Sequence, residues 1–301
     1  MRKPNLLLAT STFNKSKNAF LEKIINKKFN PVYNPYNRKL TEKELIQLLT
    51  NNNINYVVAG LEPYNKNVIK NTNLKIISRL GSGTSNINTK FIKSKKIKVF
   101  STPDGPIEAV SELTLGMIIT MLREVINLND NMHKNIWERK NGNLLFRKNV
   151  LIIGYGRIGK NLKRLLVPFR TNIIIYDNCN KYNKNLNYMP LKKALPKADI
   201  ITFHTNTEQE ILGKSEFKLL KKGVIICNSS RGSVINEKEI INHIRKKIIK
   251  KIWLDVFNDE PYFGKMSKYK DIIMTPHVGS FTEETRKKME LKAIQNIIKN
   301  I

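Results

Sequence analysis

The most specific chemical pattern in the sequence is a set of three glycines, Gly154, Gly156 and Gly159, between two predicted elements. They follow an apolar, β-branched run at 150–153 and lead into a predicted helix at 160–169. In that context Gly-x-Gly-x-x-Gly is typical of a turn that binds the pyrophosphate of a dinucleotide. The first glycine permits the tight turn, the second lets backbone amides approach the phosphates, and the third allows helix and strand to pack closely.

An acidic residue supports a dinucleotide site. Asp177 follows the next predicted strand, 172–176, where such units place the acid that binds the ribose hydroxyls and repels the extra phosphate of NADP. We therefore expect NAD as the cofactor, with Arg157 and Ile158 completing the binding turn. The two cysteines, Cys179 and Cys227, have unrelated spacing, so neither a disulfide framework nor a metal site is predicted.

Histidine is the natural proton donor near neutral pH, and the chain has four. His133 lies in a polar arm and His243 in a Lys- and Arg-rich helix, so we expect both at the surface. His204 follows a predicted strand, and His277 lies between a strand and the final helix. Ligands of open α/β sheets bind at the carboxyl ends of strands, so His204 and His277 are the candidates. With a carboxylate partner, a cation and the dinucleotide as the hydride source, such a histidine could supply the proton for reduction of a 2-keto acid.

Short apolar runs alternate with amphipathic ones along the chain, which is the pattern of parallel-sheet α/β units. In the first third, a helix near 17–26 and another opened by a capping box at Thr41–Glu44 accompany the strands. The predicted strands of this part are 6–9, 56–59, 75–78 and 98–100.

After a break at 102–106, a long helix begins with Pro106 in its first turn and leads into a polar arm containing Trp137. A second capping box, Ser280–Glu283, is predicted to open a last helix that ends near Lys299. Five runs in this part resemble buried strands: 150–153, 172–176, 199–203, 224–228 and 252–255.

The chain of 301 residues has a net charge of +30, from 54 Lys and Arg against 24 Asp and Glu. The basic residues are scattered, and the abundance of Lys, Asn and Ile fits drift in an AT-rich genome as well as it fits a polyanionic partner. We therefore expect no nucleic-acid partner. No apolar run is long enough to cross a membrane, and a cytoplasmic location is expected.

From about Leu74 onward the sequence resembles the D-isomer-specific 2-hydroxyacid dehydrogenases, including their phosphoglycerate dehydrogenase-like members. Several motifs occur in the family order: Arg79–Gly83, Glu112–Arg123, Gly154–Gly159, Asn228–Gly232, Leu254–Phe257, Glu260-Pro261 and Thr275–His277. The first 70 residues match only loosely.

The resemblance implies hydride transfer between NAD(H) and C2 of a small anionic 2-hydroxy or 2-keto acid. Arg231 would bind the substrate carboxylate and carbonyl oxygen, His277 would be the acid/base, and Glu260 would be its carboxylate partner. Backbone amides of Ser82 and Gly83 would help to hold the substrate carboxylate. Further cofactor-binding residues implied by the resemblance are His204, Thr205, Ser229, Ser230, Asp255, His277 and Gly279.

We predict an α/β protein with two doubly wound parallel-sheet domains, a Rossmann-type cofactor domain and a flavodoxin-like substrate domain. The substrate-binding lid would comprise residues 1–100 plus 281–301, and the NAD-binding domain residues 101–280, with hinges near 101–106 and 279–281. A homodimer through the cofactor domains is the family expectation. The alternative is a non-catalytic NAD(H)-sensing regulator on the same fold. The particular 2-hydroxy acid stays open.

Overall fold

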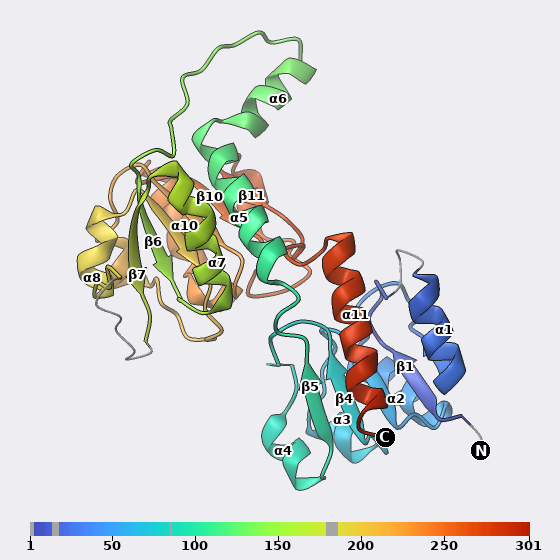
Figure 1. Ribbon diagram of the computed structural model, residues 1–301. Helices are drawn as coiled ribbons and strands as arrows, with labels where there is room; N and C mark the ends of the chain where they lie inside the picture. The colour runs from blue at the N-terminus through green and yellow to red at the C-terminus, as the bar shows by residue number, and fades with distance from the viewer. Residues whose placement is uncertain (1–2, 14–17, 85, 179–185) are drawn as a thin grey trace. The chain divides into compact units, whose positions relative to one another are not determined.

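The computed structural model describes residues 3–13, 18–84, 86–178 and 186–301, so Cys179 lies outside the described residues. The chain forms two compact units: unit 1 comprises Met1–Pro106 with Ser280–Ile301, and unit 2 comprises Ile107–Gly279. Each unit is a parallel sheet with helices against it (Figure 1). The predicted fold class, two doubly wound α/β domains, is therefore confirmed.

The sheet of unit 1 has five parallel strands in the order β2-β1-β3-β4-β5, which is the flavodoxin-like order. Alternate residues of its strands face opposite sides: Leu6 and Leu8 pack with one cluster, and Leu7 with the other. The strands are β1 (Asn5–Leu8), β2 (Asn30–Tyr33), β3 (Tyr56–Ala59), β4 (Ile76–Arg79) and β5 (Lys98–Ser101).

Helices cover both faces of this sheet. On one face lie α1 (Ala19–Lys28) and α11 (Glu283–Ile298), and on the other α2 (Glu42–Asn51), α3 (Lys66–Lys70) and α4 (Thr89–Ser94). The C-terminal helix α11 thus returns to the sheet built by the first hundred residues and contributes Met289, Ala293, Ile294 and Ile297 to its core.

Unit 2 has a six-stranded parallel sheet in the order β11-β10-β9-β8-β6-β7. Its order reverses between β6 and β8, the kind of position where α/β sheets bind ligands. The strands are β6 (Asn149–Ile153), β7 (Asn172–Tyr176), β8 (Ile200–Phe203), β9 (Val224–Asn228), β10 (Ile249–Leu254) and β11 (Ile272–Met274).

The helices of unit 2 divide between the two faces of its sheet. Helices α5 (Ile107–Leu122) and α7 (Arg157–Leu166) pack against one face, and α8 (Leu191–Ala194), α9 (Lys214–Phe217) and α10 (Glu237–Arg245) against the other. Short 3-10 turns lie at 167–169, 195–197, 232–234 and 265–268. Helix α6 (Val125–His133) starts an arm with no buried residue in that helix, and the arm returns to the sheet before β6.

All six strands of unit 2 share one register row near their carboxyl ends. Hydrogen-bonded neighbours in that row are Tyr176, Ile153, Phe203, Asn228, Leu254 and Met274. The row spans five strand spacings, or about 24 Å. Because parallel strands end at one edge, the loops after this row bring together residues that are far apart in the sequence.

The structure corrects several predicted boundaries. The edge strand β2, with Pro31 within it, was not predicted, and α7 begins at Arg157, three residues before the predicted start. The predicted domain boundary after residue 100 cuts β5, whose Ser101 pairs with Arg79, so that the chain leaves unit 1 only after Pro106.

The two predicted capping boxes had different outcomes. At α2 the box is confirmed: the Thr41 hydroxyl accepts from the Glu44 amide, and the Glu44 carboxylate accepts from the Thr41 amide at 2.9 Å. At α11 it is wrong, because the helix begins at Glu283 and Thr282 is the cap, accepting from the Thr285 amide at 3.2 Å.

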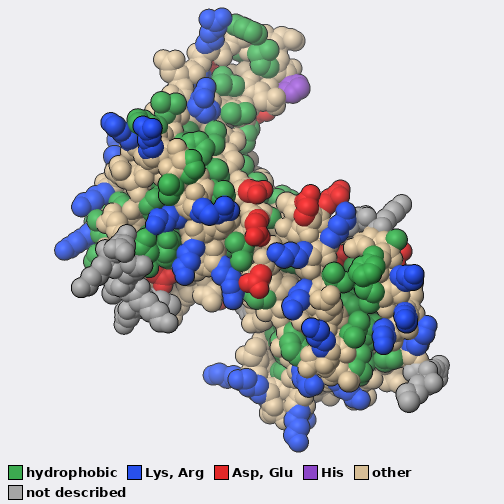
Figure 2. All heavy atoms as spheres, in the orientation of Figure 1, with side chains coloured by type: hydrophobic (Ala, Val, Ile, Leu, Met, Phe, Trp, Pro, Cys, Tyr) green, Lys and Arg blue, Asp and Glu red, His purple; other side chains and the backbone are tan. Residues whose placement is uncertain are grey.

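Lys and Arg side chains are spread over the visible face of both units in Figure 2. Across the described parts of the chain, no helix combines the length and the apolar character that a membrane span requires.

Candidate active site

His277 and Glu260 are in hydrogen-bond contact at the carboxyl edge of the unit 2 sheet. Nδ1 of His277 lies 2.8 Å from Oε2 of Glu260, and both side chains are partly exposed. The other carboxylate oxygen of Glu260 accepts from the Phe257 amide at 3.1 Å, which fixes the carboxylate. Glu260 follows β10 and His277 follows β11, so two adjacent strands bring the pair together.

A buried carboxylate underlies the loop that carries His277. Asp255 is 1% exposed, and its two oxygens accept from the Thr275 hydroxyl at 2.5 Å and the amides of Val278 and Gly279 at 2.9 and 2.8 Å. Burial raises the pKa of Asp255, and these hydrogen bonds oppose that rise. The backbone of His277 itself has a left-handed φ of 54°, a conformation that the clamped loop maintains.

Arg231 lies in a turn held by Asn228, the last residue of β9. The Asn228 amide group donates to the Arg231 carbonyl at 2.8 Å and accepts from the amide and hydroxyl of Ser230. Ser229, also in this turn, is half-buried, and its hydroxyl lies 3.5 Å from that of Thr114 on α5. Arg231, Glu260 and His277 thus follow β9, β10 and β11, three neighbouring strands.

The glycine turn has the geometry that its sequence predicts. Gly154 has φ +91°, and a Cβ there would meet the His204 carbonyl oxygen at 2.6 Å. A Cβ on Gly159 would lie 2.2 Å from the Gly154 carbonyl oxygen, so the helix packs directly on the turn. At Gly156, by contrast, an added Cβ would meet nothing within 4 Å.

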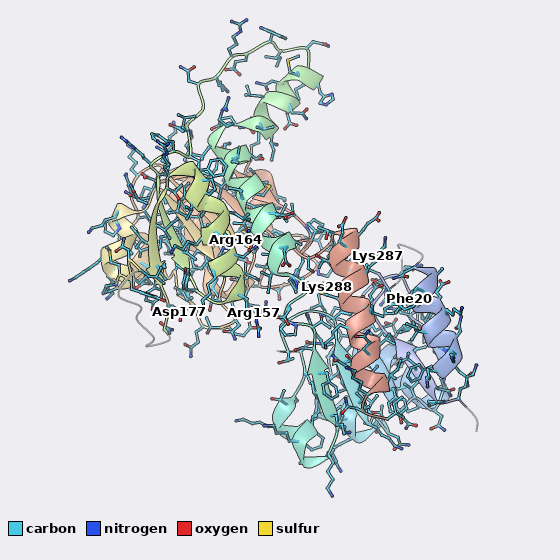
Figure 3. The ribbon with its side chains drawn as sticks, viewed as in Figure 1. Phe20, Arg157, Arg164, Asp177, Lys287 and Lys288 are labelled. Atoms are coloured by element: carbon cyan, nitrogen blue, oxygen red, sulfur yellow. The ribbon has the colours of Figure 1, made fainter. Side chains whose placement is uncertain are left out.

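Asp177 is placed beside this turn. Its carboxylate accepts from the Tyr155 amide at 2.5 Å. Figure 3 labels Arg157, at the start of α7, and Asp177, after β7, at the same end of unit 2. Ile158 follows Arg157 in the first turn of α7, and no side chain caps that helix at Gly156. The N-terminus of such a helix is a position where backbone amides bind anions.

His204 is half-buried beside Gly154, and its two ring nitrogens are buried without a hydrogen-bond partner within the described part of the chain. Burial lowers its pKa to about 3, so the ring is neutral at physiological pH. Thr205, next to it, is half-buried, and its hydroxyl accepts from the Thr207 amide at 3.3 Å. The unpartnered imidazole, the open space at Gly156 and the uncapped helix fit a dinucleotide.

Ser82 and Gly83 lie in unit 1, after β4. Ser82 is exposed and Gly83 half-buried. The preceding Gly81 has φ +111°, and its amide donates to the Thr102 hydroxyl at 2.7 Å. The two residues therefore stand at the carboxyl edge of the unit 1 sheet.

Of the two histidines expected at the surface, only one is exposed. His133 lies exposed on the arm, but His243 is 6% exposed, with its ring 4.7 Å from that of Phe217 and Nδ1 2.9 Å from the Glu239 carbonyl oxygen. Among the residues that the structure describes, no group of three His, Cys, Asp or Glu could hold a metal ion.

Two parallel-sheet units, one of them with a glycine turn beside an acid, define a dinucleotide-binding protein of the α/β class. A family model described as "D-isomer specific 2-hydroxyacid dehydrogenase, NAD binding domain" matches residues 115–279, more than half of the chain and all within unit 2. The chain therefore belongs to the D-isomer-specific 2-hydroxyacid dehydrogenases, and it is an NAD-dependent enzyme.

Curated relatives differ in substrate. The chain is 29% identical over 239 residues to hydroxypyruvate reductase of Thermotoga maritima, covering 76% of this chain and 78% of the relative. It is 28% identical over 260 residues to glyoxylate reductase of Thermococcus litoralis, covering 80% and 78%. Against D-3-phosphoglycerate dehydrogenase of Methanocaldococcus jannaschii it is 30% identical over 268 residues, but covers 82% of this chain and only 49% of the relative.

Solved structures share the fold. A Polaromonas protein described as an NAD-binding D-isomer specific 2-hydroxyacid dehydrogenase superposes with a TM-score of 0.88 at 24% identity, covering 99% of this chain and 96% of that one. D-Lactate dehydrogenase from Aquifex aeolicus, complexed with NAD and lactic acid, gives 0.83 at 21% identity, covering 98% and 94%.

Proposed function

We propose that the chain interconverts a small D-2-hydroxy acid and its 2-keto acid, with His277, Glu260 and Arg231 as the catalytic residues. The observation that carries this proposal is the 2.8 Å contact between His277 and Glu260, in loops of unit 2 at the edge where the glycine turn lies. NAD(H), when bound by unit 2, would supply or accept the hydride at C2 of the substrate.

His277 is the proton donor or acceptor in this proposal. Glu260 contacts Nδ1, so Nε2 is the ring nitrogen that exchanges a proton with the substrate oxygen. The carboxylate of Glu260 orients the imidazole and stabilises it when it carries the proton. The Asp255 carboxylate accepts from the amides of Val278 and Gly279 and so fixes the loop that carries His277. This keeps His277 in position through the reaction.

Arg231 is the cation of the proposed site. A guanidinium binds a carboxylate through two parallel N–H groups and also polarises a neighbouring carbonyl. The backbone amides of Ser82 and Gly83 are assigned to the same carboxylate, as the family resemblance implies. The cofactor-binding group comprises Gly154, Gly156, Arg157, Ile158, Gly159, Asp177, His204, Thr205, Ser229, Ser230, Asp255 and Gly279.

Which keto acid the enzyme reduces is a separate question. The phosphoglycerate dehydrogenase-like interpretation stands beside glyoxylate and hydroxypyruvate, the substrates named for the other relatives. A phosphorylated acid would need a further cationic group. Arg286 of unit 1 is largely committed already, since it contacts the buried Glu290 at 3.0 Å and the Thr12 hydroxyl at 2.9 Å. Arg286 alone does not decide between phosphorylated and unphosphorylated acids, so the panel below contains both.

The test is NADH oxidation with a panel of glyoxylate, hydroxypyruvate, pyruvate, phenylpyruvate and phosphohydroxypyruvate, using the wild type, Arg231→Ala and His277→Ala. Turnover of one keto acid that both substitutions abolish would support the proposal. Phosphohydroxypyruvate as the preferred substrate would support the phosphoglycerate-like interpretation. Tight NADH binding without turnover of any compound would instead favour the NAD-sensing alternative.

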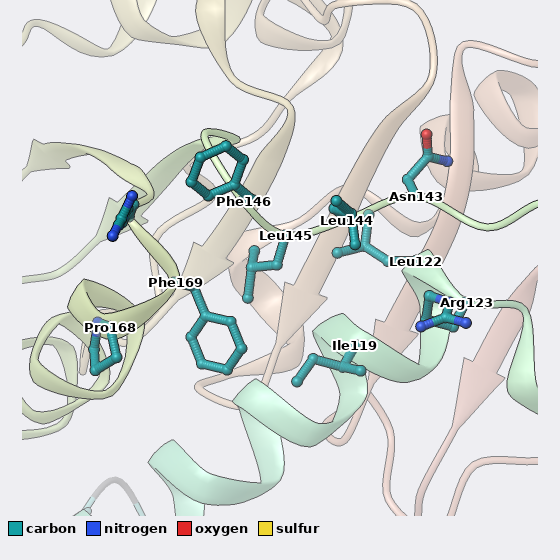
Figure 4. A pocket seen from close by; sticks show the side chains of 10 residues that line it. Ile119, Leu122, Arg123, Asn143, Leu144, Leu145, Phe146, Pro168 and Phe169 are labelled. Atoms are coloured by element: carbon teal, nitrogen blue, oxygen red, sulfur yellow. The ribbon is translucent and has the colours of Figure 1, made fainter.

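We further propose a homodimer formed through the arm of unit 2. Trp137 on the arm is 74% exposed, and Ile136 and Met132 beside it are exposed as well. Where the arm returns to α5 there is a cavity of about 400 Å³, around which Ile119, Leu145 and Phe169 face the same space (Figure 4). Its lining residues are Ile119, Leu122, Arg123, Asn143, Leu144, Leu145, Phe146, Pro168, Phe169 and Arg170.

A second copy is the occupant that this arrangement favours, because the exposed arm and the apolar cavity lie on the same unit and a two-fold axis would bury both twice. Light scattering should give a dimer for the wild type and a shift toward monomer for Trp137→Ala. The control Phe20→Ala removes an exposed aromatic side chain from α1 of unit 1 and should leave the mass unchanged. A monomeric wild type would overturn this proposal.

A further inference from the structure

Arg231 has an acidic neighbour that the sequence did not single out. Glu208 lies in the segment after β8, and its Oε1 is 3.3 Å from Nε of Arg231. Its other oxygen, Oε2, accepts from the Ser233 hydroxyl at 3.1 Å. One carboxylate therefore contacts the turn of Arg231 at two points, one on the guanidinium and one two residues farther along the chain.

The segment that carries Glu208 is fastened to the same turn by its backbone. The amides of Ile211 and Leu212 both donate to the Val234 carbonyl at 2.9 Å, and Leu212 forms an isolated bridge with Ile235. Glu208 thus stands on a segment whose end is fixed against the residues that follow Arg231. The backbone hydrogen bonds of this segment, and not only the length of the Glu208 side chain, therefore bring Glu208 close to the guanidinium.

The contacts of Arg231 leave the Nη1–Nη2 end of its guanidinium for a ligand. The N–H groups of a planar guanidinium point in three directions. Nε and Nη2 form one edge, and Nη1 and Nη2 form the end of the group. The remaining N–H of Nη1 points back toward Cδ. Glu208 occupies the Nε edge, and the Ser230 carbonyl accepts from Nη1 at 2.6 Å. In the part of the chain that the structure describes, Nη2 makes no hydrogen bond. The end of the guanidinium can therefore bind a carboxylate through two N–H groups.

We propose that Glu208 is a positioning residue for the reaction: it holds Arg231 by the Nε edge so that the Nη1–Nη2 end faces the carboxylate of the keto acid. The inference rests on the proposed substrate-binding role of Arg231. Because the Glu208 side chain is 55% exposed, its attraction to Arg231 is screened, and its effect on the orientation of the guanidinium is modest. The contact of Glu208 is with Nε, and Glu208 accepts no hydrogen bond from Nη1 or Nη2, so the Nη1–Nη2 end is left to the substrate.

The test is steady-state kinetics of Glu208→Gln with the keto acid that the panel selects, at saturating NADH. Loss of the ion pair that orients the guanidinium should raise KM about 2- to 5-fold and lower kcat less. Ser233→Ala, which removes the second contact of the carboxylate, should change KM in the same direction by a smaller factor. The matched control is Glu210→Gln on the same segment, because Glu210 accepts from Asn236 and does not contact Arg231. Its kinetics should equal those of the wild type.

A double-mutant cycle separates positioning from general damage. In an Arg231→Lys background the planar fork is gone, so Glu208→Gln should change KM by less than about 2-fold. An unchanged or lowered KM for Glu208→Gln in the wild-type background would overturn the inference. If Arg231→Ala itself left KM and kcat unchanged, the proposed role of Arg231 would fail instead. Fluorescence titration with NADH should give equal affinities for all variants, which shows that unit 2 is folded in each.

Discussion

Gly232 lies against the backbone of Phe257, so that a Cβ at Gly232 would be only 2.0 Å from the Phe257 carbonyl carbon. The two residues belong to different loops, one after β9 and one after β10. Gly232 follows Arg231, and the Phe257 amide binds the carboxylate of Glu260. The loops that carry the cation and the carboxylate of the site are therefore in direct contact, and a shift of one moves the other.

Gly232→Ala should consequently lower both stability and activity. The new methyl group cannot fit without moving one of the loops, so we expect kcat/KM to fall at least about 10-fold, since small misplacements in a site are costly. The control is Gly116→Ala on α5, where a Cβ has open space. That substitution should stabilise the protein by about 0.5–1 kcal/mol and leave kcat/KM unchanged. Equal behaviour of the two variants in thermal melts and kinetics would contradict the close contact.

Removal of the imidazole should abolish most turnover without weakening cofactor binding. We expect His277→Ala to lower kcat by about 10²- to 10⁴-fold, the usual contribution of general acid–base catalysis. Glu260→Gln keeps the shape but loses the charge that stabilises the protonated ring, so a fall near the lower end of that range is expected. Single-turnover reduction followed by NADH absorbance measures this step. Wild-type rates in either variant would contradict the assignment of the pair.

His204→Phe tests the buried, unpartnered imidazole. Because the pKa of His204 is about 3, its ring is neutral above pH 6, and the loss of NADH affinity in His204→Phe should be the same at pH 6 and pH 8. We expect that loss to be about 5- to 10-fold if the ring nitrogens bind the cofactor. A loss that grows toward pH 6 would indicate a charged ring and contradict the assignment.

The same residue should make the fold sensitive to acid. The folded-state pKa lies below the ordinary value of 6.5, so its contribution to stability is complete above pH 6.5 and is lost as the pH falls. At pH 5 the loss is about 2 kcal/mol by linkage. His204→Phe has no imidazole to protonate, so its melting temperature should fall less than that of the wild type between pH 7 and pH 5. An equal fall of the melting temperature in both proteins would contradict a lowered pKa for His204.

Asp177→Ala should weaken the preference for NADH over NADPH. In the proposed cofactor site this carboxylate binds the ribose hydroxyls and repels the 2′-phosphate of NADPH. A charged hydrogen bond contributes about 1.5–3 kcal/mol, or about 10- to 100-fold. We expect the ratio of kcat/KM for NADH to that for NADPH to fall within this range. The Tyr155 amide also loses its acceptor, so KM for NADH should rise. An unchanged ratio of the two kcat/KM values would contradict the assignment of Asp177 to the cofactor site.

The cap of α2 gives a pH prediction for unit 1. Hydrogen bonds from Arg38 and the Thr41 amide lower the pKa of Glu44 from 4.5 to about 2. A carboxyl group with a lowered pKa stabilises the fold above its ordinary pKa, and that contribution is lost as the pH falls from 4.5 toward 2. Calorimetry should therefore show Glu44→Gln melting below the wild type at pH 7, with the difference disappearing near pH 2. A difference that persists at pH 2 would contradict this account.

Local patterns in the sequence predicted much of the scaffold. Buried strands such as β3 and β9 were recognised with their observed bounds because they are short apolar runs. Gly154 and Gly159 have the tight turn and the close packing that their spacing implies. The edge strand β2 escaped recognition because, with Asn30 and Pro31 among its four residues, it lacks an apolar run.

What the sequence could not show depends on contacts across the fold. His243 was misplaced at the surface because its helix is rich in charge, although the residue itself faces Phe217. Ser280–Glu283 has the pattern of a capping box, but the cap is Thr282, two residues after Ser280, which only the backbone reveals. The contact of Glu208 with Arg231 joins two loops on adjacent strands, and no local signal marks such a pair.

The register row of unit 2 has a consequence for how the enzyme can change over evolutionary time. Behind the row, six strands form a common frame, and beyond it each strand ends in its own loop: the glycine turn after β6, His204 after β8, Arg231 after β9, and Glu260 and His277 after β10 and β11. Insertions or deletions beyond the row alter one functional group at a time, whereas a one-residue slip within a strand reverses its inward and outward faces. New substrate preferences can therefore arise loop by loop, while the frame itself tolerates almost no change in length.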